Sequence, residues 1–113
     1  MKIVIAGGKA KADYLIRLLN GKGHQLIVIN DDLEFCTYLS QAHQIPVVHG
    51  DPCKLYVLDE ANIEDGDVII ALKAADADNL AICQTAKRLY RVKKTVAVVG
   101  NPKSVDIFKK TWN

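Results

Sequence analysis

The stretch MKIVIAGGKAKADYL, residues 1–15, joins a short apolar run to a pattern with helical spacing. Residues 2–6 predict a buried strand, and the sequence from 11 to 22 predicts an amphipathic helix. The expected inward face of that helix consists of Tyr14, Leu15, Leu18 and Leu19. Gly7 and Gly8 lie between strand and helix, where a tight turn favours residues that tolerate positive φ. This order of elements is typical of the first unit of a parallel α/β sheet.

The same alternation continues to residue 100. Further strands are expected at 25–29, 46–50, 67–72 and 95–100, and further helices at 32–43, 53–61 and 76–91. Because the strands are nearly continuous β-branched runs, helices are expected on both faces of the sheet. The sequence therefore predicts an α/β fold, a Rossmann-like doubly wound parallel sheet of about five or six strands in the order 3-2-1-4-5.

Aspartates mark the expected starts of two helices. Asp31 or Asp32 is expected to cap the second helix. The inward face of that helix is predicted to hold Leu33, Cys36 and either Leu39 or Tyr38. Asp51 and Pro52 are expected to supply the cap and the first-turn proline of the helix at 53–61.

Residues 1–100 are expected to form one nucleotide-binding domain, and residues 101–113 to begin a crossover or dimerisation helix. The final segment carries a cluster of large apolar side chains, namely Val105, Ile107, Phe108 and Trp112. We interpret this cluster as a surface for a homodimer, with packing back onto the chain's own sheet as the alternative.

Composition narrows the functional classes. A net charge of +2 over 113 residues is too small to indicate nucleic acid or an anionic membrane as the partner. The first residues are too short for a signal peptide, so a cytosolic protein is expected. Cys36, Cys53 and Cys83 lack C-x-x-C spacing and are expected to be reduced thiols. An enzyme is not expected, because no nucleophile–histidine or acid–base carboxylate pair is visible.

A binding crevice is expected beyond the carboxyl ends of the strands, where the strand order reverses. Four loops meet there, and each holds residues that a nucleotide site could use. The candidate binding residues are Gly7, Gly8, Lys9, Ala10, Lys11, Asn30, Asp31, Asp32, Gly50, Asp51, Leu72, Lys73 and Asn79.

The roles of these residues follow from a phosphate-binding fingerprint. In G-x-G-x-x-A, with Gly7 first and Ala12 last, Lys9 takes the place of the middle glycine. The amides that start the first helix would face a phosphate, and Asn30 would accept a ribose hydroxyl. Gly50 and Asp51 would border the adenine or the ribose.

Each role has a structural alternative. Asp32 and Asp51 could serve only as helix caps. Asn79 could be an ordinary helix residue, and Lys9 a solvated loop charge.

Over essentially its whole length the chain resembles the N-terminal domain of the RCK/KTN family, the Trk- and Ktr-type regulators of potassium uptake. The resemblance rests on MKIVIAGG, VINDDLEFC, VVHGDPCKLYVLDEANIEDGDVIIAL, DADNLAICQTAKRLY and VKKTVAVVGNPKSVDIFKK. It implies a cytoplasmic regulatory domain that binds NAD(H) or an adenine nucleotide. It also implies homodimers within a ring, beneath an integral-membrane potassium-translocating subunit at the inner face of the cell membrane.

Four residues depart from the family pattern. Lys9 replaces a glycine, Asn30 the ribose aspartate, Lys73 a small residue and Val98 an arginine. Because a side chain at position 9 obstructs a pyrophosphate, AMP, ADP or ATP is favoured over NAD(H). The alternatives are a degenerate site without a nucleotide and the NAD-binding domain of an oxidoreductase.

Overall fold

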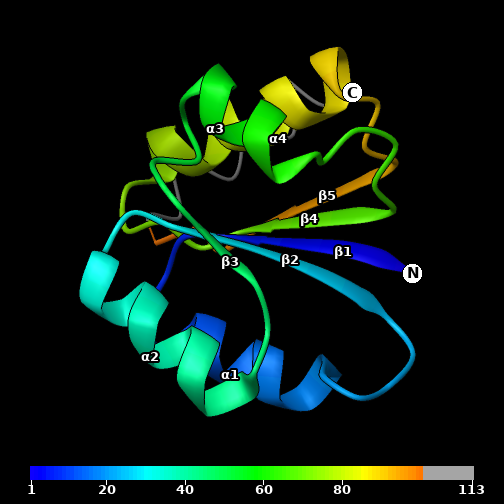
Figure 1. Ribbon diagram of the computed structural model, residues 1–113. Helices are drawn as coiled ribbons and strands as arrows, with labels where there is room; N and C mark the ends of the chain where they lie inside the picture. The colour runs from blue at the N-terminus through cyan, green and yellow to red at the C-terminus, as the bar shows by residue number, and fades with distance from the viewer. Residues whose placement is uncertain (101–113) are drawn as a thin grey trace.

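The computed structural model describes residues 1–100 as a five-stranded parallel sheet covered by helices on both faces (Figure 1). The strands are β1 (Lys2–Ala6), β2 (Gln25–Asn30), β3 (Val47–His49), β4 (Val68–Ala71) and β5 (Lys94–Ala97). The helices are α1 (Ala10–Leu19), α2 (Leu33–His43), α3 (Leu55–Ala61) and α4 (Asp76–Leu89). The strand order β3-β2-β1-β4-β5 confirms the predicted doubly wound topology. The helix expected after residue 100, with its apolar cluster, lies outside the described residues.

The central position of β1 in the sheet explains why its residues are almost all apolar. Ile5 lies opposite Val28 of β2 and Ile70 of β4, so β1 is paired along both edges. Its alternate side chains enter two cores: Val4 packs with residues of α3 and α4, and Ile5 with residues of α1 and α2. Both faces of β1 are therefore dry, as parallel sheets require.

The predicted helix faces are partly wrong. In α1 the buried residues are Ala12 and Ile16, while Tyr14 is 60% and Leu18 48% exposed. Tyr14 lies about 200° around the helix from Ala12, so burying Ala12 turns it outward. In α2, Leu33 is also exposed, although the predicted Cys36 and Leu39 are buried.

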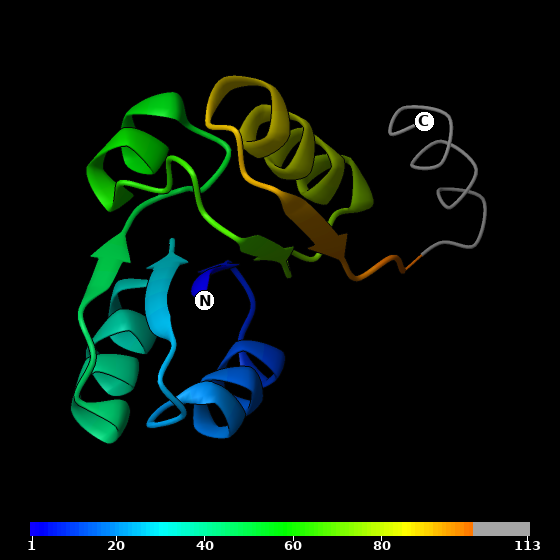
Figure 2. The same ribbon diagram turned by 90° about the vertical axis from the view of Figure 1, so that its right-hand side faces the viewer.

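The start of α3 and the edge strand β5 also differ from prediction. Asp51 and Pro52 lie in a turn before α3, where the Asp51 carboxylate accepts a hydrogen bond from the Cys53 amide at 2.9 Å. The helix itself begins at Leu55. At the edge of the sheet, Val96 of β5 is 38% exposed, because α4 packs on the other face of that strand (Figure 2).

Within residues 1–100, the helices are too short and too polar to cross a bilayer.

Candidate functional site

The loops that follow β1, β2, β3 and β4 meet at the carboxyl edge of the sheet, as predicted. The Gly7 amide donates to the Ile29 carbonyl at 2.8 Å, and the Gly50 amide donates to the Asn30 carbonyl at 2.8 Å. These backbone bonds fix the glycine turn and the β3 turn on either side of the β2 loop. The loops therefore have fixed relative positions, as a binding site requires.

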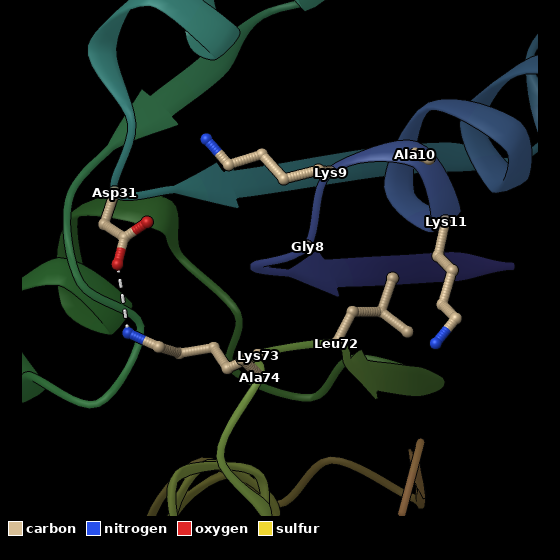
Figure 3. A pocket seen from close by; sticks show the side chains of 8 residues that line it. All are labelled: Gly8, Lys9, Ala10, Lys11, Asp31, Leu72, Lys73 and Ala74. Atoms are coloured by element: carbon tan, nitrogen blue, oxygen red, sulfur yellow. Dashed lines mark hydrogen bonds and ion pairs between the residues drawn. The ribbon is translucent and has the colours of Figure 1, made fainter. Parts of the chain in front are cut away.

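A cavity of about 470 Å³ opens between the glycine turn and the β4 loop (Figure 3). Its lining residues are Gly8, Lys9, Ala10, Lys11, Asp31, Leu72, Lys73 and Ala74. All except Ala74 were predicted from the sequence. The other predicted residues, Gly7, Asn30, Asp32, Gly50, Asp51 and Asn79, surround the cavity and hold its lining in place, as the contacts below describe.

The glycine turn is shaped by the side chains of the β4 loop. Gly7 has φ +81° and Gly8 has φ +90°, a backbone region that other residues adopt only with strain. A Cβ atom on Gly7 would lie 2.6 Å from Lys73 Cγ, and one on Gly8 would lie 2.9 Å from Leu72 Cβ. Both glycines are thus required by conformation and by close approach.

The start of α1 faces the cavity with its amides available. Lys9 precedes the helix, and its side chain makes no capping hydrogen bond. The first amides of a helix carry partial positive charge and lack intrahelical acceptors. Ala10 and Lys11 begin the helix and line the cavity, so the helix start offers donors and a cation to an anionic group.

Asn30 is a structural residue in this structure. It is 1% exposed, its Nδ2 donates to the Gly8 carbonyl at 2.8 Å, and its Oδ1 accepts from the Asp32 amide at 3.0 Å. It thereby joins the glycine turn to the β2 loop. Its Oδ1, the atom predicted to accept from a ribose hydroxyl, already accepts from the Asp32 amide.

Lys9 reaches from the glycine turn to the β2 loop, with its side chain 58% exposed. Its ammonium pairs with the Asp32 carboxylate and lies 5.2 Å from the centre of the Phe35 ring. The hydrogen bond from Lys9 lowers the pKa of Asp32, with help from the Phe35 amide. Asp32 also caps α2 by accepting from that amide at 3.0 Å. Asp32 therefore acts as the cap of α2, and Lys9 is an exposed charge that has a specific carboxylate partner.

Lys73 binds two carboxylates from two loops. Its ammonium lies 3.0 Å from Asp31 Oδ2 and 3.2 Å from Asp51 Oδ1, and its side chain is only 17% exposed. Partial burial opposes the ammonium, yet the two carboxylates outweigh it and raise the pKa of Lys73. Burial likewise opposes ionisation of Asp51, but the Cys53 amide and Lys73 lower the pKa of Asp51 overall.

Asn79 is not an ordinary helix residue. Fully buried in α4, it accepts from the Lys73 amide at 2.8 Å and donates to the Lys73 carbonyl at 2.9 Å. It also donates to the Val98 carbonyl at 3.1 Å. This clamp fixes the backbone of Lys73 at the rim of the cavity.

The lining contains three lysines and one aspartate, and its excess of positive charge is offset by the ion pairs with Asp32 and Asp51 just outside the lining. Lys9 and Lys73 are ion-paired, whereas Lys11 makes no ion pair with a described residue. Within residues 1–100 no group of three or more histidine, cysteine or acidic side chains is placed to hold a metal ion.

Sequence reasoning missed Ala74, Phe35 and His49. Ala74 lines the cavity, and the His49 ring contacts the Asp31 carbonyl at 3.2 Å. Each lies near a predicted site residue in the chain, but only the folded loops show that Ala74 lines the cavity and that Phe35 and His49 contact Lys9 and Asp31.

Known proteins share this chain's sequence pattern. A family model described as the TrkA-N domain matches residues 3–112. The Trk system potassium uptake protein TrkA homolog of Methanothermobacter thermautotrophicus is 32% identical over 110 residues. That match covers 97% of this chain and 50% of the relative, so the chain spans about half of that protein's length.

Solved structures share the fold. The RCK domain of GsuK matches with a TM-score of 0.81 at 28% identity, covering 96% of this chain and 24% of that one. The GsuK channel bound to NAD matches at 0.83 and 28% identity, covering 96% and 20%. GsuK bound to ADP matches at 0.83 and 27% identity, covering 98% and 29%.

The strand order and the glycine turn at its switch point define the class of protein, a Rossmann-like α/β domain. The chain belongs to the TrkA-N domain family.

Proposed function

We propose that this chain is a nucleotide-sensing regulatory domain of a potassium transport system, and that its cavity binds an adenine nucleotide. One observation carries the proposal. The glycine turn, the uncapped start of α1 and three lysines converge on one cavity in a TrkA-N fold. The solved GsuK structures bound to NAD and to ADP support a nucleotide as the ligand class.

Phosphates are assigned to the glycine turn. There the first amides of α1 and the ammonium of Lys11 supply hydrogen-bond donors and charge. The nucleoside is assigned to the Asp31 and Asp51 side, where carboxylates can accept from ribose hydroxyls or an amino group.

A mononucleotide is the proposed ligand, AMP, ADP or ATP in preference to NAD(H). The Lys9 side chain stands at the position of the middle glycine of the phosphate-binding fingerprint and pairs with Asp32, so the turn lacks the bare backbone that the pyrophosphate of a dinucleotide approaches. A point charge at this position can still bind a terminal phosphate.

The output of the domain is proposed to be a change in flux through a separate membrane subunit, from a homodimeric or ring assembly at the cytoplasmic face. A ligand can drive such a change only if it binds one conformation more tightly than another. Coupling of about 1–3 kcal/mol per site is typical, so repeated subunits would sharpen the response.

Calorimetry with ATP, ADP, AMP, NAD+ and NADH tests the proposal. We expect a mononucleotide to bind, and Lys11→Glu to weaken it at least about tenfold, because a cation at the phosphate becomes an anion. An acidic residue in the first turn suits the helix dipole, so the fold is retained. Lys22→Glu, in the exposed turn after α1, is the matched control and should bind normally. Tighter binding of NADH than of every mononucleotide would overturn the assigned ligand.

A further inference from the structure

Lys73 lies across the cavity in a way that the binding of a ligand must disturb. Its stem crosses the glycine turn, where Lys73 Cγ occupies the space that a Cβ on Gly7 would need. Its ammonium ends between Asp31 and Asp51. One side chain thus joins the β4 loop, the β2 loop and the β3 turn.

The two carboxylates are the acceptors to which a nucleoside would bind. Asp31 is 49% and Asp51 36% exposed at the side chain, so both are reachable from solvent. In this structure their facing oxygens are taken by Lys73. The chain's own cation therefore fills the place of a ligand's donor groups.

We propose that Lys73 is a specificity-determining residue. Its ammonium is an internal counter-ion for Asp31 and Asp51, so a ligand occupies the nucleoside half of the cavity tightly only if it also carries a phosphate. The inference rests on the proposed function and names the ligand feature that opens the same site.

The physical basis is an exchange of ion pairs. A ribose or base that takes the carboxylate oxygens facing Lys73 displaces the ammonium from them, and a partly buried cation without a partner is costly. A phosphate at the glycine turn gives the ammonium a new anionic partner, since the Lys73 stem already runs over Gly7. Adenosine offers no such partner, so it binds only those molecules in which the ammonium has left the two carboxylates. Its apparent affinity is reduced by the fraction of molecules in that state.

Lys11 provides a matched control within the same cavity. Figure 3 shows Lys9 and Lys73 reaching toward the Asp31 loop, while Lys11 points away from it past Leu72. Lys11 makes no ion pair with a described residue and closes nothing. Removing it should weaken phosphate binding without opening the nucleoside half.

The test is calorimetry of the 113-residue chain with ADP and with adenosine as probes. Wild type should bind ADP, with adenosine at least about a hundredfold weaker. Lys73→Ala should tighten adenosine at least about tenfold and reduce the ratio of ADP to adenosine affinity. Lys73→Met keeps the stem over Gly7 and removes the charge, so it should also tighten adenosine. Lys11→Ala should weaken ADP and leave adenosine unchanged.

The outcomes separate the inference from the proposed function. If wild type binds ADP and neither Lys73 variant binds adenosine more tightly, Lys73 does not determine specificity, although the nucleotide site is retained. Weaker adenosine binding in both variants would make Lys73 an ordinary ligand contact and overturn the inference. If no variant binds either probe, the inference and the proposed function both fail.

Discussion

Replacement of Asn79 by alanine should destabilise the domain strongly. The side chain is fully buried and makes three hydrogen bonds, at 2.8, 2.9 and 3.1 Å, to the backbone of Lys73 and Val98. At roughly 1 kcal/mol net for each, Asn79→Ala should lower the free energy of unfolding by about 3 kcal/mol. That is a large share of the ~5–15 kcal/mol typical of a domain.

Urea unfolding followed by circular dichroism measures this loss, read from the midpoint at constant slope. Asn20→Ala is the matched control, because Asn20 is exposed and makes one side-chain hydrogen bond, to the His43 carbonyl at 3.0 Å. It should cost less than about 1 kcal/mol. Asn79→Leu keeps a comparable side-chain volume, so it measures the loss of the hydrogen bonds without the void that alanine leaves. If both Asn79 variants cost no more than Asn20→Ala, the clamp on the β4 loop does not exist.

Three further outcomes are expected. The hydrogen bond from His43, at 2.6 Å, lowers the pKa of Asp13, so the stabilisation is present above the ordinary aspartate pKa of about 3.9 and is lost as pH falls through the folded pKa. Asp13→Asn should therefore lose less stability than wild type in acid titrations of unfolding, and an unchanged acid profile would contradict this. Burial, with Asp51 and Asp78, raises the pKa of Cys53 to about 11. At about pH 8 the Cys53 thiol should carry roughly 100-fold less thiolate than an unperturbed cysteine and react correspondingly slowly with an alkylating reagent; a rate like that of free cysteine would refute the burial argument. Lys9→Gly should shift binding from ADP toward NADH, and unchanged relative affinities would show that Lys9 does not obstruct a dinucleotide.

Much of the fold follows from local sequence. Continuous apolar runs such as residues 2–6 predict strands paired on both edges, and the right-handed crossover rule then leaves few strand orders. The inward face of α1 differs from the prediction because Ala12 and Ile16, and not Tyr14 and Leu18, lie against the sheet. Ala12 is small enough for α1 to approach the sheet closely, and this approach sets the orientation that exposes Tyr14.

The position of the candidate site was predictable, but the state of its side chains was not. Loops at the carboxyl ends of parallel strands must meet at the switch point, so Gly8 and Lys73 could be placed together from topology. The Lys73 contacts with Asp31 and Asp51 join positions 42 and 22 residues apart, and no local pattern encodes them. The sequence likewise predicts Asn30 as a ligand residue, whereas in the structure its side chain makes two hydrogen bonds within the protein.

Calorimetric titration of the 113-residue chain with ADP tests the nucleotide site most directly. Saturable binding at one site per chain is expected, with a gain of about 2.7 kcal/mol in unfolding free energy when ADP is present at 100 times its dissociation constant. Lys11→Glu should remove most of this gain, whereas Lys22→Glu should keep it. Absence of both binding heat and stabilisation at millimolar ADP, with the chain folded, would contradict the assignment of the cavity as a nucleotide site.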